Sequence, residues 1–255
     1  MAPTRYLNTE AIILKTRPVG DFDQHILLYT PHHGKLSALA KGTRRPKSQR
    51  RSSLEIGNLC HIQLYHTTTN QKIIVQSLVK ETFQNAKQNL SGILTVMTLL
   101  EMVDKSVQLE YPFPVHYNLL KQLLCCINKQ NTKSDKHLYQ RTVTLFILKH
   151  LQLFGLINDI SKCGNCHQKH WSEGYLLYHS YQIVCAGCRH RIFTSTMATT
   201  INYNTISALS NVQKNSALEN MKTHDWKEMY RIAQDLLASH LKAPLKTPAF
   251  ETLTA

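Results

Sequence analysis

Four of the seven cysteines form two C-x-x-C pairs separated by eighteen residues: Cys163, Cys166, Cys185 and Cys188. This spacing is typical of a four-cysteine zinc site, because each pair directs two sulfur atoms to one point and two pairs complete a tetrahedron. Four thiolates leave no coordination position open for a substrate, so the sequence predicts one structural Zn²⁺ per chain. A redox-active or metal-free set of thiols is the alternative.

The residues around these cysteines predict how the metal site is built. We expect Gly164 and Gly187 to ease the two turns. Between the pairs, residues 174–184 are rich in aromatic and β-branched side chains and predict a short β-hairpin. The zinc knuckle is thus expected to span about residues 159–195.

A run of cations without anions is the second chemical pattern. Between Asp23 and Glu55 the chain carries no acidic residue. Seven basic residues fall in this interval: Lys35, Lys41, Arg44, Arg45, Lys47, Arg50 and Arg51. Glycine, proline and serine around the last six predict a mobile loop, which suits a phosphate backbone better than base edges. We predict that these seven residues bind nucleic acid; a solvated face or a targeting signal is the alternative.

The composition of the whole chain agrees with a polyanionic partner. Lys and Arg total 30 against 16 Asp and Glu, which gives a formal charge of +14 over 255 residues. Hydrophobic residues make up 42%, enough for a sizeable core. No run of 18 apolar residues and no secretory signal is present, so we expect a cytoplasmic protein without membrane partners.

Catalytic motifs are missing, and we expect no enzyme active site. The sequence contains no H-E-x-x-H, no phosphate-binding G-x-x-x-x-G-K-[ST] loop and no G-x-S-x-G elbow. Asp21 and Asp23 are two carboxylates that a metal-dependent nuclease could use, although one such pair is more often part of a turn.

Two kinds of periodicity divide the chain and predict an α+β protein. Five short strands are expected from residue 11 onward and over 24–30, 35–40, 57–66 and 72–80. They predict a small closed or partly open barrel within residues 1–82. From Asn89 the apolar period becomes helical, and residues 83–255 are expected to form an α-helical domain. Its later helices are predicted over 115–128, 138–154, 199–209 and 225–241.

Several short motifs, in this order, resemble the RecO family of bacterial recombination mediators. They are AIILKT at 11–16, GDFD at 20–23, LYT at 28–30, GK at 34–35 and AKGTRRPKS at 40–48. Gly155 and Leu156 before the first cysteine pair resemble that family's zinc region. The resemblance covers most of residues 7–190. The chain departs from it at Ser180 and Tyr181, which replace glycines that usually precede the third cysteine.

The resemblance implies an OB-fold followed by a helical domain that carries the zinc knuckle. It implies binding of single- and double-stranded DNA, annealing of complementary strands, and loading of RecA together with RecR onto DNA coated with single-stranded DNA-binding protein. Lys41, Arg44 and Arg45 match the family's basic motif, and the four paired cysteines match its zinc ligands. Some members lack these cysteines, so zinc is not expected to be essential to the family's chemistry.

We therefore expect a DNA repair and homologous recombination mediator, associated with the nucleoid and without a catalytic site. A zinc-ribbon RNA-binding or transcription-associated protein is the alternative. The acidic C-terminal tail of the single-stranded DNA-binding protein is expected to bind the helical region, near six basic residues: Lys121, Lys129, Lys133, Lys136, Arg141 and Lys149.

Overall fold

The computed structural model describes most of the chain as two compact units. The described residues are 5–69, 71–129, 137–157, 159–169, 173–177, 180–192, 198–214, 226–241 and 245–246. One unit comprises Met1–Ser134 with Leu245–Ala255, and the other comprises Asp135–Pro244. Within the described residues, no helix is long and apolar enough to cross a membrane.

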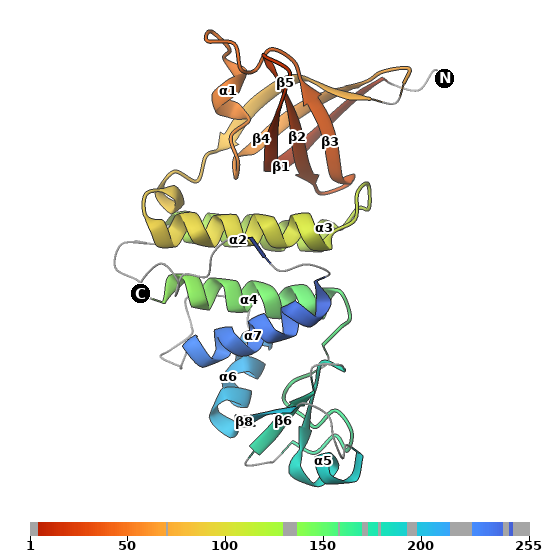
Figure 1. Ribbon diagram of the computed structural model, residues 1–255, viewed down its shortest axis with the longest axis vertical. Helices are drawn as coiled ribbons and strands as arrows, with labels where there is room; N and C mark the ends of the chain where they lie inside the picture. Colours follow the sequence, from red (N-terminus) through yellow and green to blue (C-terminus); the bar gives the residue numbers. More distant parts are fainter. Residues whose placement is uncertain are drawn as a thin grey trace. The chain divides into compact units, whose positions relative to one another are not determined.

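The first unit begins with a closed five-stranded barrel (Figure 1). Its strands are β1 (Tyr6–Val19), β2 (Asp23–Thr30), β3 (Gly34–Ala40), β4 (Leu59–His66) and β5 (Lys72–Glu81). They follow the order β1-β2-β3-β5-β4, and only the short pairing of β3 with β5 is parallel. The predicted barrel is thereby confirmed, and it has the OB-fold that the resemblance implies.

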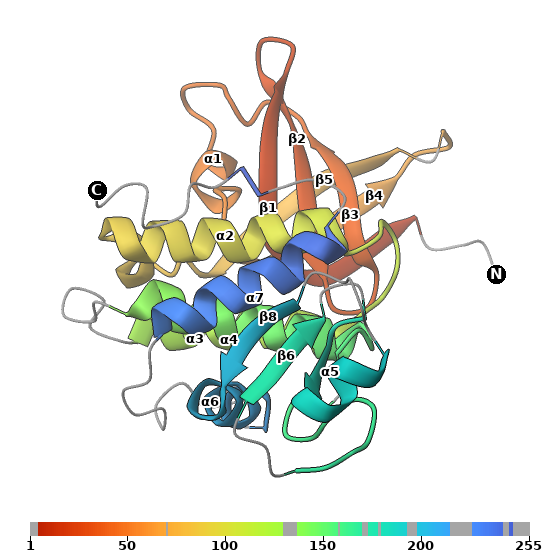
Figure 2. The same ribbon diagram turned by 60° about the horizontal axis from the view of Figure 1, so that its bottom comes forward.

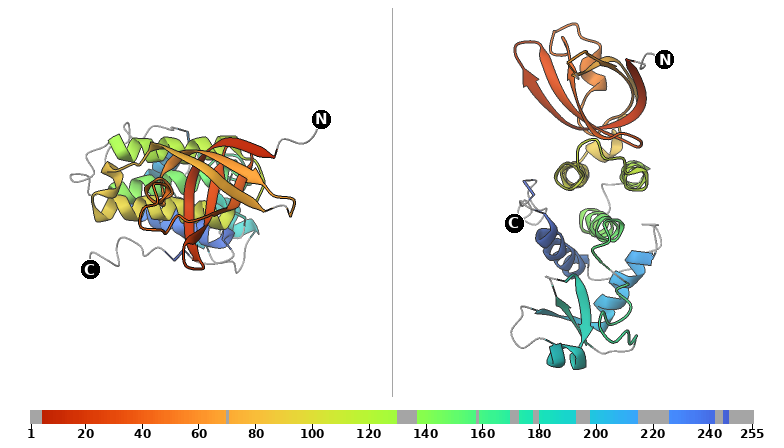
Figure 3. Two further views of the ribbon diagram at one scale, coloured as in Figure 1. Left: turned by 90° about the horizontal axis from the view of Figure 1, so that it is seen from above. Right: turned by 90° about the vertical axis from the view of Figure 1, so that its right-hand side faces the viewer.

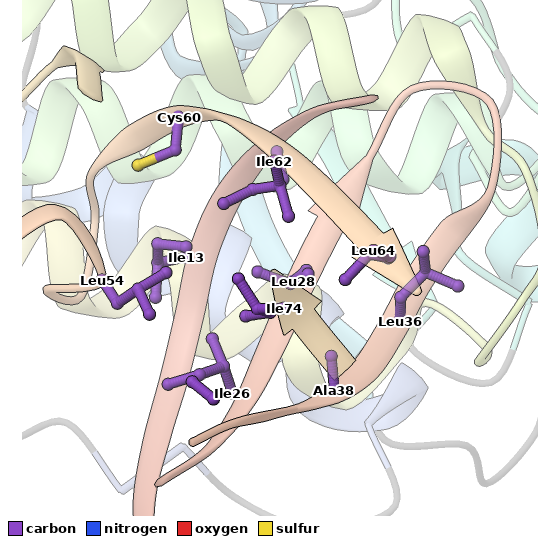
Figure 4. Packing of buried hydrophobic residues seen from close by; sticks show 12 residues of the cluster. Ile13, Ile26, Leu28, Leu36, Ala38, Leu54, Cys60, Ile62, Leu64 and Ile74 are labelled. Carbon is purple, nitrogen blue, oxygen red and sulfur yellow. The ribbon is translucent and has the colours of Figure 1, made fainter. Parts of the chain in front are cut away.

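Alternate residues of the strands fill the barrel. Ile26 and Leu28 of β2 and Ile62 and Leu64 of β4 point toward one another in its interior (Figure 4). Cys60 belongs to the same buried cluster, as the alternation of β4 predicts. Burial of these side chains on one face of each strand fixes the register, because a slip of one residue would expose them all.

Strand β1 is longer than the sequence predicts, and buried and exposed residues do not alternate along it. Its pairing with β2 shifts between Ile13 and Lys15, which marks a bulge. Ala11 and Ile13 face the barrel core, whereas Leu14 lines a cavity together with residues of α2 (Leu90–Ser106). The apolar run of residues 11–14 is therefore continuous because both faces of β1 are covered.

Two longer helices and a short 3-10 turn follow the barrel in the first unit. They are η1 (Asn85–Lys87), α2 and α3 (Pro114–Lys129), and the two α-helices are seen nearly end-on beside the barrel in the right view of Figure 3. Asn89 caps α2 because its Oδ1 accepts a hydrogen bond from the Gly92 amide at 2.8 Å. Helix α3 is tied to the barrel through Glu10, which contacts both Tyr117 and Lys121.

The second unit combines helices with a small three-stranded sheet. Its elements are α4 (Leu138–Leu153), β6 (Glu173–Leu177), β7 (Gln182–Cys185), α5 (Ala186–Ile192), β8 (Ala198–Asn202), α6 (Tyr203–Lys214) and α7 (Trp226–His240). Strands β6 and β7 form the predicted hairpin, and β8 pairs with the other edge of β6 (Figure 2). The prediction of a helix over 199–209 is wrong in its first part, since Thr199–Asn202 belong to β8.

Candidate nucleic-acid interface and metal centre

The basic segment after β3 is a series of turns followed by helix α1 (Arg50–Ser53). Backbone hydrogen bonds run from the Ser48 amide to the Arg45 carbonyl and from the Leu54 amide to the Arg50 carbonyl, at 3.0 and 3.2 Å. The predicted loop therefore consists of turns and one short helix, and its mobility stays a prediction. Its backbone hydrogen bonds are made both within the segment and with the β1–β2 turn.

The turn between β1 and β2 anchors this segment. The Asp23 carboxylate accepts a hydrogen bond from the Gly42 amide at 2.8 Å. The Arg44 amide donates to the Phe22 carbonyl at 2.9 Å, and the Arg44 guanidinium donates to the Gly20 carbonyl at 3.1 Å. Asp23 thus has a structural role, which removes much of the support for a nuclease built on Asp21 and Asp23.

Five cations of the segment are exposed to solvent: Lys41, Arg44, Arg45, Lys47 and Arg51. Among the residues that the structure describes, no acidic side chain forms an ion pair with any of them. Arg50 is held differently, because its guanidinium donates to the carbonyls of Ile74 and Lys41 at 3.0 and 3.1 Å.

The segment also forms an open hollow of about 840 Å³. Lys41, Arg45, Lys47 and Arg50 are among its lining residues, together with the Asp23 carboxylate that holds Gly42. Exposed cations without acidic partners around a hollow can neutralise phosphate groups without first breaking an internal ion pair.

Lys35 lies apart from this group. Its side chain is buried, and its ammonium group pairs with the Asp104 carboxylate at 3.6 Å and also donates to the Asp104 carbonyl. Burial lowers the pKa of Lys35, and the Asp104 carboxylate offsets part of that effect. The structure brings together six of the seven predicted cations and places Lys35 in a structural ion pair.

The four paired cysteines converge in the second unit. Their sulfur atoms all lie within 4.8 Å of one another, and the sulfurs of Cys166 and Cys185 are 3.8 Å apart. All four are free thiols, so no disulfide competes with a metal. A zinc ion at about 2.3 Å from each sulfur requires sulfur–sulfur distances of about 3.8 Å. The cluster therefore fits a tetrahedral metal ion.

The backbone around the cysteines differs from the expected pair of glycine turns. Positive φ angles occur at His167 (60°) and Tyr181 (54°), while Gly164 and Gly187 have none. The second pair is divided between two elements, with Cys185 at the end of β7 and Cys188 in the first turn of α5. A strand–helix junction thus replaces the second loop-like turn.

Hydrogen-bond donors surround the sulfur atoms. The Asn165 side-chain amide donates to the Cys188 sulfur at 3.3 Å, and the Cys185 amide donates to the Cys163 sulfur at 3.4 Å. Burial alone would raise the pKa of Cys163, but backbone N–H donors of Cys166, Cys185 and Asn165 outweigh it and lower the pKa to about 6. These donors favour the thiolate form of Cys163, whereas burial raises the pKa of Cys185.

Comparison with known proteins identifies the family. A family model described as "Recombination protein O N terminal" matches residues 1–83, and one described as "Recombination protein O C terminal" matches residues 88–249. The chain belongs to the recombination protein O family. This confirms the family that the ordered sequence motifs indicate, and with it a role in DNA repair.

Several relatives of the recombination protein O family are similar over much of their length. The DNA repair protein RecO of Thermodesulfovibrio yellowstonii is 29% identical over 76% of this chain and 74% of its own. The protein of the same name from a Thermoanaerobacter species is 24% identical over 96% of this chain and 97% of its own. The DNA repair protein RecO of Bacillus pumilus is 24% identical over 71% of this chain and 68% of its own.

Sequence reasoning missed the role of the β1–β2 turn in the interface. Asp23 is predicted there only as part of a family motif and, with Asp21, as a candidate nuclease pair, and Phe22 only as part of the same motif and as one of four barrel aromatics that could stack on bases. The available signal was that Asp23 is the last acidic residue before the run of cations. A carboxylate there can hold a neighbouring amide, as it does for Gly42.

Proposed function

We propose that this protein is a DNA repair and recombination mediator that binds single- and double-stranded DNA and anneals complementary strands. With RecR it would help to load RecA onto DNA coated with single-stranded DNA-binding protein, on chromosomal DNA at the cytoplasmic nucleoid. The observation that carries the proposal is the group of exposed cations without acidic partners on the OB-fold barrel of a recombination protein O family member. We propose no enzymatic step for this chain.

Annealing needs charge neutralisation and no catalytic nucleophile. Two complementary strands repel each other through their phosphates, and this repulsion slows their encounter. Lys41, Lys47 and Arg51 would each neutralise a phosphate and release the counterions condensed on it. Base pairing then supplies the free energy that joins the strands.

The cysteine cluster would hold one structural Zn²⁺ per chain. Cys163, Cys166, Cys185 and Cys188 would be its ligands, and the ion would join the β6–β7 hairpin to α5. A closed four-thiolate site contributes folding free energy and leaves no position for a substrate. The division into a DNA-binding barrel (1–82) and a helical domain (83–255) stays part of the proposal.

The acidic tail of the single-stranded DNA-binding protein is proposed to bind the helical domain. Of the six cations expected there, Lys133 and Lys136 lie outside the described residues. Lys121 pairs with Glu10 at 2.7 Å, so it is less available than the sequence suggests.

A strand-annealing assay tests the proposal. Complementary oligonucleotides, bare or precoated with single-stranded DNA-binding protein, are mixed with the wild-type chain and with the interface variant Lys41→Ala/Lys47→Ala/Arg51→Ala. The wild type should accelerate annealing of both substrates, and the interface variant should lose at least about ten-fold in rate at low salt.

A charge-matched control separates local binding from net charge. The control variant Lys169→Ala/Lys227→Ala/Arg231→Ala removes the same number of exposed cations from the second unit. Its annealing rate should stay within about two-fold of the wild type. Failure of the wild type to anneal either substrate, or stronger binding of structured RNA than of single-stranded DNA, would favour the alternative RNA-binding function.

A further inference from the structure

Phe22 is an aromatic residue at an exposed position where the barrel does not need one. It lies in the turn between β1 and β2, and 49% of its surface is exposed. It is not part of the buried cluster that fills the barrel. Exposed turns normally carry glycine and small polar residues, as Gly20, Asp21 and Asp23 are here.

The ring of Phe22 is held beside the cations of the interface. The guanidinium carbon of Arg45 lies over the ring, 5.5 Å from its centroid, which is within the range of a cation–π contact. The Phe22 carbonyl accepts a hydrogen bond from the Arg44 amide, and this bond holds the turn against the basic segment. Since Arg45 also lines the hollow, the half-exposed ring lies next to a cation of the proposed phosphate-binding surface.

The other aromatic residues of the barrel, Tyr6, Tyr29 and Tyr65, lie elsewhere. Tyr29 is fully buried, and its hydroxyl contacts His116. Tyr6 packs against Tyr65 with ring centroids 5.3 Å apart, at the start of β1, whereas Phe22 follows the end of that strand. Among the described aromatic residues of the barrel, Phe22 is thus the one with a cation–π contact to the basic segment.

We propose that the Phe22 ring stacks on an unpaired base of a single strand whose phosphates are bound by the neighbouring cations. This inference rests on the proposed DNA-binding function and adds a preference for single strands over duplex. A ring beside phosphate-binding cations is the usual stacking platform for single strands, and it accepts any base because every base has a π-face. Bases within a duplex are already stacked and expose no face to the ring.

Binding measurements on three probes of equal length test the proposal. The probes are a mixed-sequence single strand, an abasic single strand that keeps the phosphates, and a duplex. Phe22→Leu keeps an apolar side chain but loses the aromatic ring, and Phe22→Trp keeps an aromatic one. Phe22→Leu should bind the mixed-sequence strand about ten-fold more weakly, with the abasic strand and duplex unchanged. Phe22→Trp should bind it as well as the wild type.

The salt dependence provides a second readout. Phe22→Leu should keep the wild-type slope of log K against log salt, because it removes no phosphate contact. Equal binding of the mixed-sequence strand by wild type and Phe22→Leu would overturn the stacking role, as would an equal loss on the abasic strand. If the wild type binds none of the probes, the proposed function itself fails and the inference falls with it. Thermal unfolding of each variant confirms that it is folded.

Discussion

Glu10 shows how one carboxylate can hold the barrel to a helix. Its two oxygens accept hydrogen bonds from Lys80 at 2.9 Å, from Lys121 at 2.7 Å and from the Tyr117 hydroxyl at 2.9 Å. Burial alone would raise the pKa of Glu10, but these three donors lower it from 4.5 to about 2. The ionised form is thus favoured in the folded state.

Because the folded-state pKa of Glu10 lies below the unfolded value, its contribution to stability is present above about pH 4.5 and is lost as the pH falls toward 2. Glu10→Gln should lower the free energy of unfolding at pH 7 by about 1–2 kcal/mol, after allowance for solvent screening. Denaturant titrations at pH 7, 5 and 3 measure this. The difference between variant and wild type should shrink at the lowest pH.

Glu110 offers a matched comparison for Glu10. It forms an ion pair with Lys72, but 61% of its side chain is exposed. Glu110→Gln should therefore change stability by less than about 0.5 kcal/mol at any of these pH values. A Glu110→Gln effect as large as that of Glu10→Gln would show that burial of the Glu10 network is not what matters.

Among the elements, β4 follows the local sequence pattern and β8 does not. Cys60, Ile62 and Leu64 alternate with polar residues because one face of β4 lies in the barrel, and that alternation is visible in the sequence. Residues 198–202 form a strand because β6 offers them a pairing edge. That partner lies more than twenty residues away in sequence, so local pattern could not reveal it.

At the metal site, too, one feature could be predicted from the sequence and another could not. The four ligand positions follow from C-x-x-C spacing, and their sulfur atoms do converge. The turn geometry was not predictable, because the left-handed residue before the third cysteine is Tyr181, a side chain that rarely adopts positive φ. Spacing determines which atoms meet, while the backbone path between them depends on packing against the hairpin and α5.

Removal of the proposed zinc should loosen one part of the second unit only. Metal analysis of the purified chain should find one zinc, and Cys163→Ser should lower that content and cost about 2–4 kcal/mol of stability. In hydrogen exchange, a strong chelator should raise the exchange of β6, β7 and α5. Exchange in the strands of the barrel should stay unchanged, because they belong to the other unit.

Cys126→Ser is the control for this metal experiment. Cys126 is a free thiol on α3, outside the cluster, so its replacement should leave the zinc content unchanged. Well under one zinc per chain in protein whose cysteines are reduced would contradict the metal assignment.

At the scale of the whole molecule, net charge predicts the class of partner but not where it binds. The formal charge of +14 is spread over both units, and several basic residues are used internally. Lys35 pairs with Asp104, and Lys121 pairs with Glu10. What marks the segment from Lys41 to Arg51 is that its exposed cations have no acidic partner there, which depends on tertiary contacts as well as on sequence.

The contrast between the internally paired lysines and the exposed cations of this segment leads to a prediction about salt dependence. Each contacted phosphate of a single strand contributes about −0.7 to the slope of log K against log salt. The interface variant Lys41→Ala/Lys47→Ala/Arg51→Ala should therefore bind single-stranded DNA with a slope flatter by about 2 units. The control variant Lys169→Ala/Lys227→Ala/Arg231→Ala should keep the wild-type slope, although both variants lose the same net charge.

Salt titrations on two unrelated oligonucleotides should give the same result for each, since phosphate contacts carry no sequence information. Equal slopes for the two variants would mean that DNA senses the overall field of the molecule, and a strong preference for one oligonucleotide would mean that the segment contacts base edges.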